Sequence, residues 1–159
     1  MVYEVQSRSL YGIIRLKKKN MATRSIVRFA KREVGVSFSE HPERVEIQVY
    51  KHYDGYPEGH PTDLAKFLKG FSIVNGIGSD THKVSNGLGC LAAQYVAAFK
   101  QEAGDIYLEN SDTKRGDIEY ITYVWGDEGK SIWMSIFDVY EKRCIFVGKP
   151  QELIDKYEE

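Results

Sequence analysis

Side chains that could do chemistry gather in one nine-residue stretch, residues 52–60. The stretch reads His-Tyr-Asp-Gly-Tyr-Pro-Glu-Gly-His, with two histidines and two carboxylates close together. Imidazole and carboxylate groups bind zinc, iron and manganese, and they also transfer protons. His52, Asp54 and His60 are therefore candidate metal ligands. Together with Glu58 they would form the site of a small metal-dependent hydrolase of phosphoester substrates.

The same stretch also has a structural interpretation. Gly55 and Gly59 permit backbone conformations that other residues avoid, and Pro57 fixes its own φ angle, as in a tight turn between a strand and a helix. The order of the ligands matches no established motif such as HExxH. A non-enzymatic binding module, which requires no cofactor, is thus the leading hypothesis, and the hydrolase, with its divalent metal, is the alternative. The candidate binding residues are Arg24, His52, Asp54, Tyr56, Glu58 and His60.

Two Asn-Gly-x-Gly segments form a weaker candidate site. They begin at Asn75 and Asn86, and the second precedes a predicted helix. Backbone N–H groups at a helix N-terminus attract anions, so Asn86, Gly87 and Gly89 are candidate anion-binding residues. Neither copy fits G-x-G-x-x-G or the P-loop, and an N-cap at Asn86 is the simpler explanation.

Hydrophobic periodicity predicts the elements that position these residues. Alternating apolar and polar residues predict strands over residues 23–30 and 45–50, the second of which leads into His52. Apolar residues at helical spacing predict one helix capped by Thr62 or Asp63. A second helix is predicted after Asn86, further strands over residues 106–108, 117–125, 131–139 and 143–147, and a short helix after Pro150.

Together these elements predict an α+β fold with an antiparallel sheet. The sheet would join an N-terminal strand pair to a C-terminal three-strand meander, with two main helices packed on one face and a short C-terminal helix. Residues 21–159 suit a single domain in size. Residues 1–20 form a basic extension or arm with a net charge of +4. The charged residues of this arm are Glu4, Arg8, Arg15, Lys17, Lys18 and Lys19.

Composition limits the class of partner. The net charge of −1 gives no general attraction for nucleic acid, so such binding is expected only through the Arg8–Lys19 arm. No apolar run approaches the length of a membrane span, and no membrane partner is expected. Cys90 and Cys144 have no metal-ligand or redox spacing. A cytoplasmic protein with two reduced, buried thiols is therefore predicted.

Two motifs resemble those of a known group of proteins. Residues 21–25, Met-Ala-Thr-Arg-Ser, and residues 52–59, followed by a helix, are similar to small uncharacterised proteins of bacteriophage genomes. The resemblance covers residues 21–70 and implies a domain that starts at Met21. It implies a phage or host cytoplasm as the setting and a host or viral protein, or a small ligand, as the partner, but no particular activity. The chain departs from the pattern at His60-Pro61-Thr62, so no role for His60 follows from the resemblance.

Overall fold

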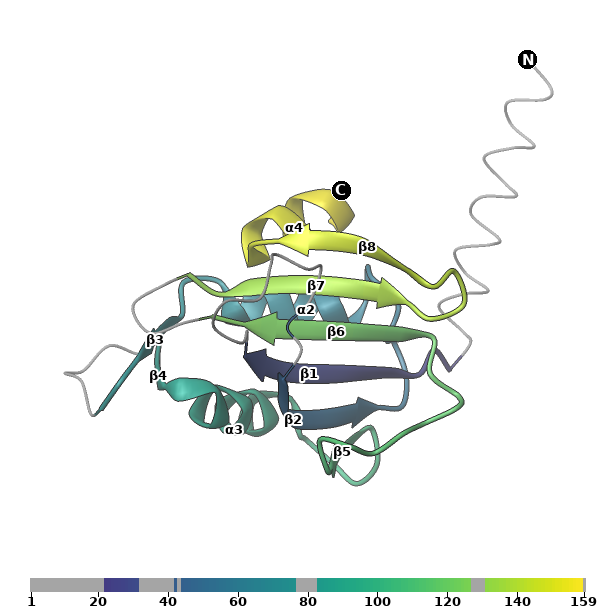
Figure 1. Cartoon of the computed structure of the whole chain (residues 1–159), viewed down its shortest axis with the longest axis horizontal. Helices are drawn as coiled ribbons and strands as arrows, with labels where there is room; N and C mark the ends of the chain where they lie inside the picture. The colour runs from purple at the N-terminus through teal and green to yellow at the C-terminus, as the bar shows by residue number, and fades with distance from the viewer. Residues whose placement is uncertain (1–21, 32–41, 43, 77–82, 127–130, 159) are drawn as a thin grey trace, which may run out of the picture.

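The structure is a computed structural model that describes residues 22–31, 42, 44–76, 83–126 and 131–158 (Figure 1). The basic arm lies outside these residues. Among the described residues, no helix is both long and apolar enough to cross a membrane. The helices are α2 (His60–Leu68), α3 (Gly87–Phe99) and α4 (Pro150–Tyr157). The strands are β1 (Ser25–Lys31), β2 (Arg44–Lys51), β3 (Ser72–Val74), β4 (Val84–Asn86), β5 (Ile106–Glu109), β6 (Tyr120–Trp125), β7 (Trp133–Asp138) and β8 (Arg143–Gly148).

A six-stranded sheet with the order β5-β2-β1-β6-β7-β8 forms the centre of the fold. Neighbouring strands are antiparallel except β1 and β6, which run parallel with Ser25 opposite Tyr120. The α+β class is therefore confirmed, but the sheet is mixed rather than antiparallel. The reason is that the N-terminal strand pair and the C-terminal meander join along β1 and β6. The short β3 and β4 form a separate parallel pair.

The helices and the main core lie on one face of this sheet, and Figure 1 shows α2 behind the strands. Alternate strand residues such as Val27, Phe29 and Val49 are buried in this core. They meet Leu64 of α2 and Leu91 of α3, which are fully buried. Burial of each such side chain contributes about 1.5–3 kcal/mol to folding. The hydrophobic periodicity of the sequence thus reflects this shared core.

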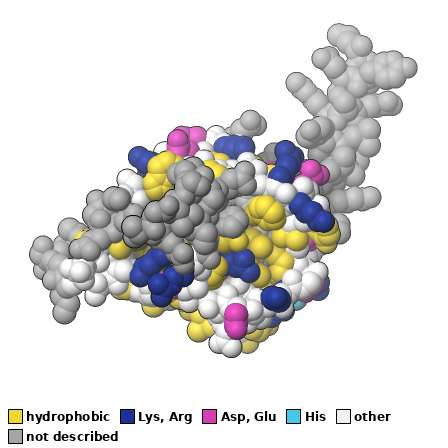
Figure 2. Space-filling view, viewed as in Figure 1, with side chains coloured by type: hydrophobic (Ala, Val, Ile, Leu, Met, Phe, Trp, Pro, Cys, Tyr) yellow, Lys and Arg dark blue, Asp and Glu magenta, His cyan; other side chains and the backbone are white. Residues whose placement is uncertain are grey.

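The opposite face of the sheet combines aromatic and polar side chains. Arg28 lies in its centre and donates hydrogen bonds to Gln48 (2.9 Å) and to the Tyr123 hydroxyl (3.0 Å). Figure 2 shows the side of the molecule away from α2, where lysine and arginine side chains lie among hydrophobic ones. Cys90 and Cys144 are free thiols, as predicted, but both are only partly buried.

The turn between β2 and α2 packs tightly against the residues that precede β1. The Gly55 N–H donates a 3.0 Å hydrogen bond to the Thr23 carbonyl. A Cβ at Gly55 would lie 2.4 Å from Ser25 Oγ, and one at Gly59 would lie 2.4 Å from the Asp54 carbonyl oxygen. Both glycines are therefore required by close approach, in agreement with the structural interpretation of the turn.

Helix α2 starts earlier than the sequence predicts. Gly59 is its N-cap and His60 its first residue, because the His60 N–H donates to the Asp54 carbonyl at 2.7 Å and Pro61 suits the first turn. Thr62 does not cap the helix. Its hydroxyl instead donates a 2.7 Å hydrogen bond to the Pro57 carbonyl and so holds the turn against the helix.

The close approach of Gly55 to Ser25 gives a stability prediction. Gly55→Ala should lower the free energy of unfolding by about 1–3 kcal/mol, because the added methyl group overlaps Ser25. Gly116→Ala is a matched control, since a Cβ there would meet no atom within 4 Å. Urea denaturation measures both variants. Equal stabilities would contradict the packing of the turn on β1.

Candidate functional site

The side chains of residues 52–60 point in different directions. His52 lies on the polar face of the sheet, with its Nδ1 3.0 Å from the Tyr50 hydroxyl. His60 lies on the helix side, with its Nε2 2.6 Å from the Tyr95 hydroxyl. Among the described residues, no group of three histidine, cysteine, aspartate or glutamate side chains could hold a metal ion. The metal-ligand set of His52, Asp54 and His60 is thus separated, because the two histidines lie on opposite sides of the sheet.

The other predicted residues of the turn have different surroundings from His52. Asp54 is exposed and has a positive φ of 59°, and its carbonyl accepts the His60 N–H. Tyr56 is half-buried and its ring packs on Gly59. Glu58 is exposed on the α4 side: burial raises the pKa of Tyr157, and the charge of Glu58 raises it further. The four side chains of the proposed hydrolase therefore do not converge.

His60 belongs to the core rather than to an exposed edge. Its side chain is only 3% exposed and packs against Tyr95 and Phe99, with ring centroids 5.6 and 5.0 Å away. Burial, together with the nearby charge of Lys51, lowers the pKa of His60 to about 3. The imidazole is therefore neutral at physiological pH. The early start of α2 explains this position, because the first residue of the helix turns inward toward α3.

A second polar pair, in which only the lysine is buried, lies beside His60. Lys51 is 7% exposed and forms an ion pair with Asp105. Burial, with the charge of Asp105, raises the pKa of Tyr95, so its phenol remains protonated and bonded to His60. These pairs connect β2, α2, α3 and the segment before β5. They hold these elements together, and β2 carries residues on the polar face of the sheet as well.

Arg24 and His52 meet in a pocket on the polar face, beside the end of β2. Arg24 immediately precedes β1, and His52 directly follows β2. Tyr50 lies opposite Ile26 of β1 and Tyr107 of β5, so the strand order brings three elements together. The pocket has a volume of about 330 Å³. We call it the arginine pocket, and its lining residues are Arg24, Tyr50, His52, Tyr107, Arg115 and Asp117.

Two guanidinium groups dominate the electrostatics of the arginine pocket. The Arg115 guanidinium carbon lies 3.8 Å from the centre of the Tyr50 ring, and its Nε donates to Glu109. The Arg24 Nη1 lies 3.4 Å from Asp117. Burial raises the pKa of Tyr50, and Asp117 adds to this shift, so the phenol remains protonated. The pocket therefore offers charged donors next to neutral aromatic rings.

A row of rings continues from the pocket along this edge. Successive ring centroids are 5.0 Å apart from Tyr53 to His52, 5.9 Å from His52 to Tyr50 and 5.8 Å from Tyr50 to Tyr107. Tyr53 and Tyr107, the ends of the row, are 40% and 47% exposed. Lys100 Nζ lies 5.5 Å from the centre of the Tyr107 ring. Exposed rings beside cations can bind a planar, anionic group.

The predicted anion site at the second Asn-Gly-x-Gly segment is divided. Asn86 is the N-cap residue of α3, as predicted, but its side chain makes no capping hydrogen bond and instead accepts a 3.0 Å hydrogen bond from the Gly76 N–H. Asn86 and Gly87 line a cavity of about 260 Å³ with Lys31, which pairs with Glu46 at 3.2 Å. Gly89 instead lines an apolar groove between α3, β2 and β5. The three predicted residues therefore do not face a common cavity.

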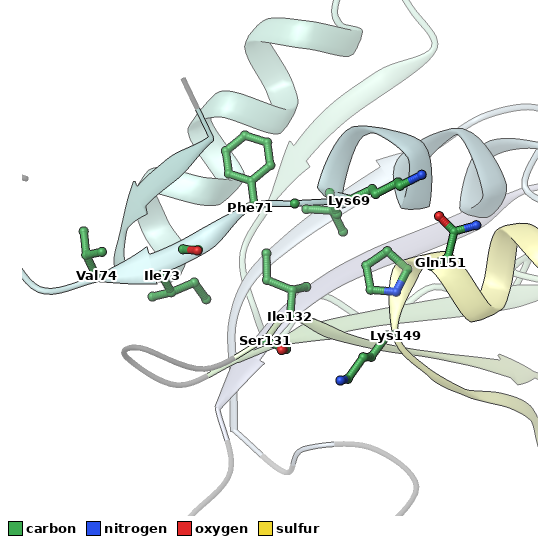
Figure 3. Close-up of a pocket in the computed structure, with 12 residues that line it drawn as sticks. Lys69, Phe71, Ile73, Val74, Ser131, Ile132, Lys149 and Gln151 are labelled. Carbon is green, nitrogen blue, oxygen red and sulfur yellow. The ribbon is translucent and has the colours of Figure 1, made fainter. Parts of the chain in front are cut away.

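A larger cavity, of about 420 Å³, lies between the end of α2, β3 and the start of α4 (Figure 3). Its wall includes Phe71, Ile132 and Pro150. Lys69 and Lys149 also line it, but in Figure 3 their side chains point away from each other. Binding sites combine an apolar wall with polar groups that converge on the ligand. The arginine pocket meets this condition better than the larger cavity.

Comparison with known proteins adds no assignment to this geometry. No family model, curated protein or solved structure matches the chain. Four residues of the arginine pocket were not predicted as site residues from the sequence, namely Tyr50, Tyr107, Arg115 and Asp117. The alternation of residues 106–109 places Tyr107 on one face, but only the pairing of β5 with β2 shows that Tyr50 is its neighbour.

The buried His60 gives a prediction for the pH dependence of stability. The pKa of His60 rises from about 3 in the folded state to an ordinary value near 6.5 on unfolding, so the unfolded chain binds the extra proton between these values. Stability is therefore lost as the pH falls below about 6.5. Between pH 7 and pH 5 the wild type should lose about 2 kcal/mol more than His60→Gln. Urea denaturation at each pH measures this difference, and parallel pH curves would contradict a neutral, buried imidazole.

Proposed function

We propose that this protein is a non-enzymatic binding module whose ligand occupies the arginine pocket. The observation that supports the proposal is the convergence of Arg24, His52 and Arg115, from three separate segments, on one concave site of about 330 Å³. Tyr50 and Tyr107 provide apolar surface in the same site. A few polar groups directed into a pocket with aromatic walls are typical of ligand sites.

The contacts of the turn support this proposal because they hold the pocket in shape without a ligand. The hydrogen bond from Gly55 to Thr23 fixes the residue next to Arg24. The His52 N–H donates a 2.8 Å hydrogen bond to the Asp105 carbonyl, which fixes the end of β2 relative to β5. A site that is already ordered loses less conformational entropy on binding. In this proposal the remaining turn residues support the site and do not contact the ligand.

The biological setting remains the one that the sequence resemblance implies. We propose an accessory protein of bacteriophage type that acts in the host cytoplasm and binds a host or viral protein or a small ligand. This part of the proposal rests on the motifs within residues 21–70. Of those motifs, Arg24 and His52 are the residues that line the pocket.

The binding function can be tested without knowledge of the natural ligand. A library of small fragments is added to isotope-labelled full chain, and shifts of the backbone amide signals are recorded by NMR. We expect the fragments that bind to shift signals around residues 24, 50, 52, 107 and 115. Tyr107→Ala should weaken these fragments at least tenfold, because it removes an exposed ring of the pocket wall.

Tyr140→Ala is the matched control, since Tyr140 is 75% exposed and does not line the pocket. It should leave the fragment shifts unchanged. Fragments that gather instead at the cavity between α2 and α4, or at the apolar groove of α3, would refute the proposed function. The same conclusion would follow if no fragment shifted the pocket residues.

A further inference from the structure

We infer that the ligand of the arginine pocket carries an oxyanion, a carboxylate or a phosphate, attached to a planar ring. This inference rests on the binding function proposed above and names the class of ligand. Its two parts come from different observations. The charges and hydrogen-bond donors of the pocket indicate the oxyanion, and the exposed rings indicate the planar group.

The charge that faces the cavity is positive. Two guanidinium groups, those of Arg24 and Arg115, line it against the single carboxylate of Asp117. Glu109 is close by but is not a lining residue. Its carboxylate is directed at protein donors, because one oxygen accepts from Arg115 Nε and the other accepts from Gln48 Nε2 at 2.9 Å. The lining therefore favours an anion over a cation.

Both arginines also retain donors for a ligand. Arg24 contacts Asp117 through Nη1, and among the described residues its Nη2 has no hydrogen-bond partner. Within the same part of the chain, Arg115 donates only from Nε, and its stacking on Tyr50 orients the guanidinium plane. The planar fork of a guanidinium group matches the oxygens of carboxylates and phosphates. An oxyanion would thus accept from donors that the protein leaves unused.

The rings at the edge of the pocket indicate the second part of the ligand. Tyr107 lines the pocket and is 47% exposed, and its ring lies 5.8 Å from that of Tyr50 at an angle of 44°. An exposed ring beside oriented cations provides a surface on which a planar group can stack. A cavity of about 330 Å³ is within the range of small-ligand sites and has room for one ring and its oxyanion.

Simple aromatic probes test both parts of the inference. Dissociation constants are measured by NMR titration of the full chain with phenyl phosphate, benzoate, the neutral benzamide, the cationic benzamidine and inorganic phosphate. At least one of phenyl phosphate and benzoate should bind at least tenfold more tightly than benzamide and benzamidine. The better of these two anions identifies phosphate or carboxylate as the source. Inorganic phosphate should bind at least tenfold more weakly than phenyl phosphate, because it cannot stack.

Matched arginine variants test the residues themselves. Arg24→Gln and Arg115→Gln should each weaken the better anionic probe at least tenfold, and Arg115→Lys should restore only part of the loss, because it keeps the charge without the fork. Arg143→Gln is the control, since Arg143 pairs with Glu141 at 3.4 Å and does not line the pocket. Thermal unfolding of each variant establishes that it is folded before its affinity is compared.

The outcomes separate this inference from the proposed function. If fragments and probes shift the pocket signals but benzamide or benzamidine binds as tightly as both anions, the oxyanion is refuted and the binding function stands. If inorganic phosphate binds as tightly as phenyl phosphate, the planar ring is refuted. If neither fragments nor probes shift the pocket signals, the proposed function fails as well.

Discussion

The hydrogen bond from the Gly55 N–H to the Thr23 carbonyl is the contact on which the rest of the site depends. It brings the backbone of the turn so close to Ser25 that no side chain larger than hydrogen fits at Gly55. This contact sets the position of His52, which follows β2, relative to Arg24, which precedes β1. A local steric constraint on one glycine thereby determines the distance between two residues of the proposed site.

The end of β2 divides polar groups between the two sides of the sheet. Successive strand residues point to opposite faces, so Tyr50 and His52 face the arginine pocket while Lys51 faces the helices. On the helix side, burial lowers the pKa of His60, so its imidazole stays neutral, and Lys51 forms an ion pair with Asp105. Buried polar groups with satisfied partners favour one arrangement of the surrounding elements. The pairs on the helix side therefore stabilise the fold, and the residues of the arginine pocket remain accessible to a ligand.

Most of the individual elements could be predicted because their signals are local. Ile47 and Val49 alternate because one face of β2 packs on the main core, and the spacing of Leu64 and Leu68 follows from burial of one side of α2. Val45 does not share that face, because the β-bulge opposite Phe29 and Ala30 turns it toward Tyr123 and Trp125. The parallel pairing of β1 with β6 could not be predicted, because alternation shows which face of a strand is buried but not which strand lies beside it. The inward position of His60 was missed for a related reason. It depends on the start of α2 and on Tyr95, thirty-five residues later.

The sequence alone determined the α+β class and the turn at Gly55 and Gly59, and it indicated Arg24 and His52 as candidate binding residues. Tertiary structure alone decided which side chains share a site. Tyr107 reaches Tyr50 only because β5 pairs with β2, a contact between segments more than fifty residues apart. Asp117 reaches Arg24 because the segment before β6 lies beside the start of β1. Periodicity and turn chemistry are set by neighbouring residues, whereas a pocket is set by strand order. The sequence could therefore indicate two residues of the proposed site, and only the arrangement of the strands shows which other residues lie beside them.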